Sequence, residues 1–182
     1  MSELLRRAAA LIPGDARSDA GCTSADVLDY LDHNEPEVAH GVLEDFDGIA
    51  WQTDEFWDLL VESAQQMRLS TEWIAWRKEE TRHGLLRAEL DLAAEADPIP
   101  AGVRRGTRWD LGDGVLRLAA MRIESMPVLE PGRTAVVRLR PAEPWQHLSV
   151  GAVIALHESQ PMVGVATVIE LVRVGETRQR DR

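Results

Sequence analysis

The side chains best suited to chemistry are carboxylates, and they are concentrated in the first half of the chain. Residues 1–84 hold 18 Asp and Glu against 7 Lys and Arg, a net charge of −11, whereas residues 85–182 hold 13 of each. Paired carboxylates serve acid–base catalysis when they lie in a cleft, and nothing in the sequence indicates one. We expect instead an acidic surface that repels nucleic acid and attracts a basic partner, with solubility alone as the alternative. The carboxylates expected in this partner surface are Asp29, Asp32, Glu35, Glu37, Glu44, Asp45, Asp47, Asp54, Glu55 and Asp58.

Tryptophans accompany these carboxylates. Trp51, Trp57, Trp73 and Trp76 all lie in the acidic half, and tryptophan is enriched at the centres of protein-binding surfaces. The helical spacing around Trp57 favours core packing for that residue. We expect Trp51 and Trp73 to contribute to the partner surface, with core packing as the alternative.

Other chemistries lack the residues they need. The chain has five histidines without HxxxH spacing, one cysteine (Cys22), no GxSxG and no GxxxxGK[ST]. We therefore expect no enzyme activity, no metal and no cofactor. A single cysteine fits a reducing compartment, and the N-terminus lacks a membrane span or signal peptide, so we expect a cytoplasmic protein.

The second half contains one local basic cluster, formed by Arg104, Arg105 and Arg108. Its functional interpretation is contact with phosphate or with an acidic partner. The alternative, which we favour, is a solvated loop.

The elements that position these residues change character at residue 85. Helix-capping residues and apolar spacing of 3.6 predict helices that begin after Ser2, Ser24, Asn34, Thr53 and Ser70 or Thr71, with Gly84 ending the last. Their expected apolar faces include Leu28 and Val38. From Leu85, apolar and polar residues alternate with the period of a strand.

The strand-like segments follow one another without an intervening helix. They are 85–92, 116–125, 134–139, 153–157 and 162–172, and Pro98, Pro100 and Gly102 are expected in a loop. This arrangement predicts a sandwich or barrel. The expected fold class is therefore α+β with two domains: an acidic helical bundle (1–84), an antiparallel β-barrel (85–174) and a frayed tail (175–182).

The second half resembles the C-terminal, third β-barrel domain of elongation factor Tu. The resemblance is carried in order by the opening strand Leu86–Ala94, the segment Ile99–Gly114, Val150-Gly151, His157-Glu158, and Val163-Gly164 with Val165, Thr167 and Val168. It implies a barrel of that type and a translation-linked role. Where the family often has Gly-Tyr-Arg-Pro-Gln-Phe, this chain has Gly-Val-Arg-Arg-Gly-Thr at 102–107, so the family's tRNA contacts do not carry over.

The first half resembles the MafI/CdiI-like small immunity proteins. The matching residues are Tyr30, His33, Asn34, Glu35, Ala39, Leu43, Phe56 and Met67. Such proteins bind and block a cognate toxin, often a nuclease. The resemblance implies a protein-binding function in which the acidic helices plug a basic toxin domain.

Two functions follow as expectations. The first is a non-catalytic, immunity-like inhibitor of a basic, nuclease-type toxin. The second is a translation-linked adaptor whose barrel binds tRNA or a translation-factor partner. Nucleic acid binding is not expected for the helical half, and no membrane partner is expected.

Overall fold

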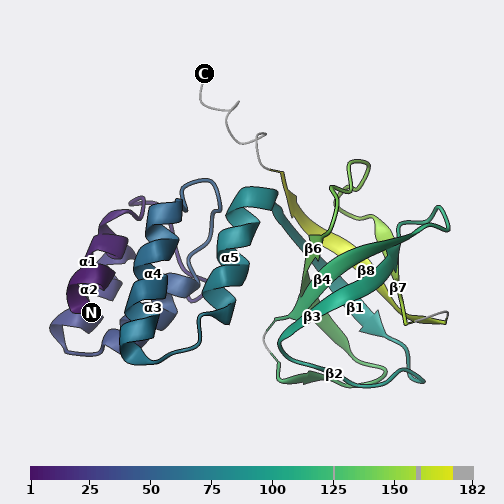
Figure 1. Cartoon of the computed structure of the whole chain (residues 1–182), viewed down its shortest axis with the longest axis horizontal. Helices are drawn as coiled ribbons and strands as arrows, with labels where there is room; N and C mark the ends of the chain where they lie inside the picture. Colours follow the sequence, from purple (N-terminus) through teal and green to yellow (C-terminus); the bar gives the residue numbers. More distant parts are fainter. Residues whose placement is uncertain (125, 159–160, 174–182) are drawn as a thin grey trace. The chain divides into compact units, whose positions relative to one another are not determined.

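The structure is a computed structural model that describes residues 1–124, 126–158 and 161–173. It has an α+β architecture and divides into two compact units, with the boundary between His83 and Gly84 (Figure 1). The first unit is helical and the second is a β-barrel. The predicted frayed tail, 175–182, lies outside the described residues.

Five helices form the first unit: α1 (Ser2–Ala10), α2 (Ser24–Asp32), α3 (Pro36–Glu44), α4 (Asp54–Met67) and α5 (Glu72–His83). Helix α1 packs against α2, α3 and α4, and α4 also packs against α3 and α5. The shared core is built on large apolar side chains that are fully buried, including Leu5, Leu43, Phe56, Trp57 and Leu60.

The helix starts differ from the predicted caps by one residue at three places. The N-caps are Met1, Thr23 and Glu35 in place of Ser2, Ser24 and Asn34. Thr23 prevails over Ser24 because it forms a capping box with Asp26. Asn34 has a φ of 61°, the left-handed conformation that asparagine tolerates well, and it belongs to the turn before α3. Thr53 caps α4 as predicted, accepting a hydrogen bond from the Phe56 amide.

Two apolar residues that the helical spacing assigned to the core lie at the surface. Leu28 is 37% exposed and Val38 is 45% exposed. The buried residues of α2 are Val27 and Leu31, and those of α3 include Ala39 and Leu43. The buried stripe on each helix is therefore narrower than the apolar stripe of the sequence.

The second unit is a closed six-stranded antiparallel barrel with the strand order β1-β6-β4-β3-β7-β8. Its strands are β1 (Leu85–Leu92), β3 (Val103–Asp110), β4 (Leu116–Ile123), β6 (Thr134–Pro141), β7 (Val153–His157) and β8 (Met162–Val172). A separate two-stranded sheet consists of β2 (Ile99–Pro100) and β5 (Val128–Leu129). Pro100 therefore lies in a short strand and not in the predicted loop, and β4 ends at Ile123, short of the predicted 125.

The barrel interior is filled by alternate residues of every strand. Trp109 is fully buried, and its indole N–H donates to Thr107 Oγ1 at 2.9 Å. The Thr107 hydroxyl in turn donates to the Ala119 carbonyl at 2.7 Å, which connects β3 with β4. The large aromatic side chain therefore keeps its polar atom satisfied inside an apolar core.

Gly84 begins the barrel unit in a position that requires glycine. Its φ is +100°, and a Cβ there would lie 2.4 Å from the Val172 carbonyl oxygen. Glycine permits both the left-handed backbone and the close approach of the last barrel strand.

Candidate functional site

The predicted acidic surface lies on the outside of the helical unit. Nine of its ten carboxylates are exposed, and Glu44 is half-buried. They are carried by α2, by the turn before α3, by α3 with the segment that follows it, and by the first half of α4. Their local surroundings divide them into groups with different electrostatic character.

The three predicted carboxylates of α4, Asp54, Glu55 and Asp58, each lie near a cation of the same unit. Asp58 lies 2.5 Å from Lys78 Nζ, and Asp54 accepts from Arg82 at 2.9 Å. Glu55 lies 3.7 Å from Arg7 on α1. Three of the unit's cations are therefore committed to this group, which reduces the net charge that it presents to a partner.

The carboxylates around the α2–α3 connection have fewer lysine and arginine partners. We name Asp29, Asp32, Glu35 and Glu37 the acidic turn. Asp32 is paired with Arg6 at 2.5 Å. Neither Glu35 nor Glu37 forms an ion pair with any residue in the described part of the chain, and both are exposed. The acidic turn is therefore less compensated than the α4 group.

His33 lies within the acidic turn and responds to it. Its Nδ1 is 2.9 Å from the Asp29 carbonyl oxygen and 3.6 Å from the Asp29 carboxylate. The hydrogen bond to the Asp29 carbonyl, and then the charge of the Asp29 carboxylate, raise the pKa of His33 above its usual 6.5. Protonation of His33 would offset part of the negative charge of the turn.

The remaining carboxylates follow α3. Glu44 lies 3.5 Å from Nδ1 of the buried His40. Main-chain groups of Asp45 and Asp47 anchor neighbouring segments: the Asp45 carbonyl accepts from the Asp19 amide, and the Asp47 carbonyl accepts from the Trp51 indole. These residues therefore combine exposed side chains with a structural role for their backbone.

Both predicted surface tryptophans are half-buried and packed. Trp51 donates to the Asp47 carbonyl at 2.8 Å and meets Phe56 edge-to-face, with ring centroids 4.9 Å apart. Trp73 lies against the Arg77 guanidinium, 5.6 Å from ring centroid to Cζ. Trp57 is fully buried, as its helical spacing predicts. Trp51 and Trp73 therefore stabilise the fold as well as reaching the surface.

Two apolar residues on the helices that carry the acidic turn are exposed, although their helical spacing predicts that they are buried. Leu28 on α2 and Val38 on α3 are exposed beside acidic neighbours in sequence. The local sequence gives no signal for their exposure, because adjacent helical residues are often buried together, as Phe56 and Trp57 are.

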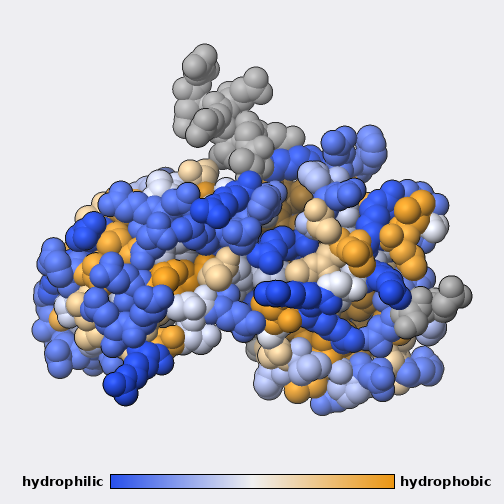
Figure 2. Space-filling view, viewed as in Figure 1, coloured by the Kyte–Doolittle hydropathy of each residue, from blue (hydrophilic) through white to orange (hydrophobic). Residues whose placement is uncertain are grey.

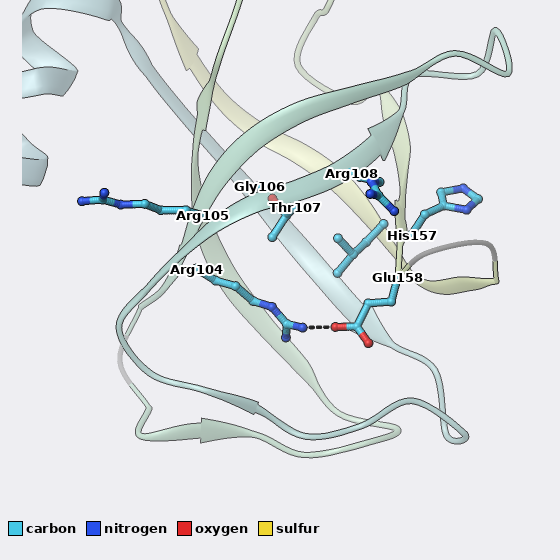
Figure 3. Close-up of a pocket in the computed structure, with 8 residues that line it drawn as sticks. Arg104, Arg105, Gly106, Thr107, Arg108, His157 and Glu158 are labelled. Carbon is cyan, nitrogen blue, oxygen red and sulfur yellow. Dashed lines mark hydrogen bonds and ion pairs between the residues drawn. The ribbon is translucent and has the colours of Figure 1, made fainter.

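The basic cluster belongs to a strand and not to a loop. Arg104, Arg105 and Arg108 lie on β3, and they line a groove of about 290 Å³ with His157 and Glu158. Figure 3 shows Arg104 directed at Glu158, with which it forms an ion pair, and Arg105 directed away from Glu158. Arg104 and Arg105 are consecutive residues of one strand, so their side chains point to opposite faces. The three guanidinium groups do not converge on one phosphate-sized point.

Metal and membrane sites receive no support from the described residues. Residues 1–124, 126–158 and 161–173 contain no cluster of three or more His, Cys, Asp or Glu suited to a metal ion. The same residues contain no helix long and apolar enough to cross a membrane.

Comparison with known proteins leaves the two resemblances without independent support. The chain matches no protein-family model, and no curated protein matches it. The structure establishes the helical unit and the closed six-stranded barrel as folds. A relation to immunity proteins or to elongation factor Tu is a proposal.

Proposed function

We propose that this protein is a non-catalytic, cytoplasmic inhibitor that neutralises a basic, nuclease-type toxin through its acidic helical surface. One observation carries the proposal: the helical half has a net charge of −11, and the second half is balanced. The resemblance of Val27–Asp47 and Asp54–Leu69 to small immunity proteins is consistent with it.

The acidic turn is the part of the surface best suited to such a partner. Glu35 and Glu37 form no ion pair with a described residue that binding would have to break, so their charges are available to a basic partner. Exposed Leu28 and Val38 supply apolar area on the same two helices. Charge steers the encounter and fixes orientation, while desolvated apolar contacts contribute most of the affinity.

Co-purification of the full chain from its native host tests the proposal with two charge-matched variants. The first is Asp29→Asn/Glu35→Gln/Glu37→Gln, and the second is Asp54→Asn/Glu55→Gln/Asp58→Asn. Both remove three negative charges. We expect a basic nuclease-type protein to be retained by the wild type and by the α4 variant, and to be lost from the acidic-turn variant.

The same pair of variants separates local recognition from bulk charge. Equal loss of the partner from both would show that only net charge matters. Retention of abundant bulk proteins alone by the wild type would count against the inhibitor. Once a partner is in hand, its nuclease activity should fall in proportion to added wild-type protein, at a ratio of one to one.

The second candidate function is a translation-linked adaptor, which the closed six-stranded antiparallel barrel favours. The barrel would then bind tRNA or a translation-factor partner, as its resemblance to the last domain of elongation factor Tu implies. A gel shift of the full chain with tRNA at low and at moderate salt tests the RNA version, because phosphate contacts weaken steeply with salt. The lack of any shift at low salt would remove it.

A further inference from the structure

The outer face of the barrel carries apolar side chains where polar ones are usual. Leu116 and Leu118 on β4 are 43% and 51% exposed, and Val115, just before β4, is 53% exposed. Met162 on β8 and Val153 on β7 are exposed to a similar extent. Figure 2 shows apolar patches interrupting the hydrophilic surface of the barrel unit. Of these residues, Val115, Leu116 and Leu118 lie together on or just before one strand, and an exposed apolar cluster marks a candidate interaction site.

A groove of about 360 Å³ runs beside this part of β4. Leu116, Leu118, Pro144 and Trp145 supply its apolar lining, and Glu143 also lines it. Trp145 is almost wholly buried and belongs to the barrel core as well as to the lining of the groove. A groove of this composition fits one large aliphatic or aromatic side chain.

Arg108 lies on the neighbouring strand β3 and does not itself line this groove; it lines the groove around Glu158. It is the cross-strand partner of Leu118, which places their side chains as neighbours on the outer face. Arg108 is exposed and forms no ion pair with any described residue. The nearest outward carboxylate along β3, Asp110, already accepts from the amides of Gly112, Asp113 and Gly114.

The opposite side of the groove has the opposite charge. Ala142 donates its amide hydrogen to the Leu118 carbonyl, so Glu143 follows β6 on the side of β4 away from β3. Glu143 is exposed and forms no ion pair with a described residue, while Arg117, the other charged lining residue, is paired with Asp113 at 2.6 Å. An apolar groove is thus flanked by an available cation on one side and an available anion on the other.

From this arrangement we propose that the β4 groove binds a protein segment with a large apolar residue flanked by a carboxylate and a basic residue. The apolar side chain occupies the groove, the carboxylate pairs with Arg108, and the basic group pairs with Glu143. The charges fix the direction in which the segment crosses β4. This surface is separate in residues and in chemistry from the acidic turn, so the proposal does not rest on the proposed function.

A selection from a random peptide library displayed on phage, with the full chain as bait, tests the proposal. We expect enriched peptides to carry the acidic–apolar–basic pattern in one direction. The double variant Arg108→Glu/Glu143→Lys leaves the net charge of the chain unchanged, and it should select the pattern in the reverse direction. Enrichment of the same sequences by both proteins, or of none by either, would overturn the proposal.

Binding of one enriched peptide, measured by fluorescence anisotropy, provides the quantitative arm. Leu118→Ser and Arg108→Glu should each weaken it at least about tenfold. Two control variants should change the binding affinity by less than about twofold. Ile169→Ser removes an exposed apolar side chain on a different strand, β8, and Arg105→Glu makes the same charge change on β3. Equal weakening by the control variants would overturn the proposal.

Other occupants of the face are separable in the same set of variants. Sedimentation equilibrium of the full chain would reveal a dimer, and flotation with vesicles of anionic lipid would reveal membrane binding. Either one, if abolished by Leu118→Ser and unaffected by Ile169→Ser, would assign the face to that occupant and overturn the peptide proposal. Circular dichroism melting of each variant verifies that these surface substitutions leave the fold intact.

Discussion

The helical unit and the barrel treat their charged residues differently. In the second half of the chain acidic and basic residues are equal in number, and Glu124 is closely paired: it accepts from Arg87 at 2.7 Å and lies 2.5 Å from Arg138. In the helical unit the 18 acidic residues outnumber the 7 basic ones, so many cannot be matched. Ion pairs with Lys78, Arg82 and Arg7 lie where α4 meets α5 and α1, whereas Glu35 and Glu37 of the acidic turn form no ion pair with a described residue.

The net charge of a unit and the charges that it offers to a partner are distinct properties. The barrel is balanced overall and still exposes Arg108 and Glu143 on either side of an apolar groove. The helical unit is strongly acidic, and Asp54, Glu55 and Asp58 on α4 still lie near cations of the same unit. The ion pairs within each unit therefore decide which charges are available to a partner. Substitutions can change these ion pairs in one unit without changing those of the other.

The largest expected effect comes from removing a core tryptophan from either unit. The two apolar cores share no residue, and Trp57 and Trp109 are each fully buried. Trp57→Ala and Trp109→Ala should each lower the free energy of unfolding of their own unit by about 3–5 kcal/mol. Hydrogen exchange measured by mass spectrometry should show lost protection only in the unit that carries the substitution. Equal loss of protection in both units would mean that they unfold as one, which would contradict the expectation that each core stabilises its own unit.

A smaller effect is expected at the start of the barrel. Gly84→Ala should lower the free energy of unfolding of the barrel by about 2 kcal/mol or more, because the new Cβ meets the Val172 carbonyl and the backbone is left-handed. Gly102→Ala is the matched control, since Gly102 has a φ of +107° and open space around it. It should cost about 1 kcal/mol. Chemical denaturation measures both, and equal losses would rule out the steric contribution.

Acidification should affect the helical unit through one buried histidine. Burial lowers the pKa of His40 below its usual 6.5, although a hydrogen bond to the Leu60 carbonyl opposes the shift. The folded unit then binds this proton more weakly than the unfolded chain, so the stabilisation is present above pH 6.5 and is lost as the pH falls through the folded pKa. Denaturation of the wild type and of His40→Gln between pH 7.5 and 5 should show a shallower decline for the variant. Identical slopes would contradict a neutral buried His40.

The smallest effect distinguishes paired from unpaired carboxylates. Asp58→Asn removes an exposed ion pair with Lys78 and should cost about 0.2–1 kcal/mol, less at high salt. Glu35→Gln removes a charge without an ion pair among the described residues, and its effect should lie within about 0.5 kcal/mol of zero. Urea denaturation at low and high salt gives both values. A larger loss for Glu35→Gln than for Asp58→Asn would reverse the assignment of compensated and available charge.

The strands were the most predictable elements. Three of them, Leu85–Leu92, Val153–His157 and Met162–Val172, have the bounds that the sequence predicts. Their alternation of apolar and polar residues is visible within a few neighbouring positions, and Gly or Pro bounds each one. The helix starts were less predictable because Thr23 and Ser24 are both good capping residues, and only the carboxylate of Asp26 decides between them.

The candidate sites were predictable in composition and not in geometry. The sequence identifies the acidic surface and the three arginines of β3, but it does not indicate that Asp54 and Asp58 meet Arg82 and Lys78 from another helix. It also does not show the shift in register between Arg104 and Thr107, because that shift depends on pairing with β4.

The helical and strand periods, the change at residue 85 and the location of the excess negative charge can all be derived from the amino-acid sequence, since they depend on near neighbours and on residue counts. The pairing of the carboxylates, the exposure of Leu28 and Val38, and the meeting of Leu118 with Glu143 at one groove beside Arg108 depend on the tertiary structure. Those properties depend on contacts between residues distant in the chain, which no local pattern encodes.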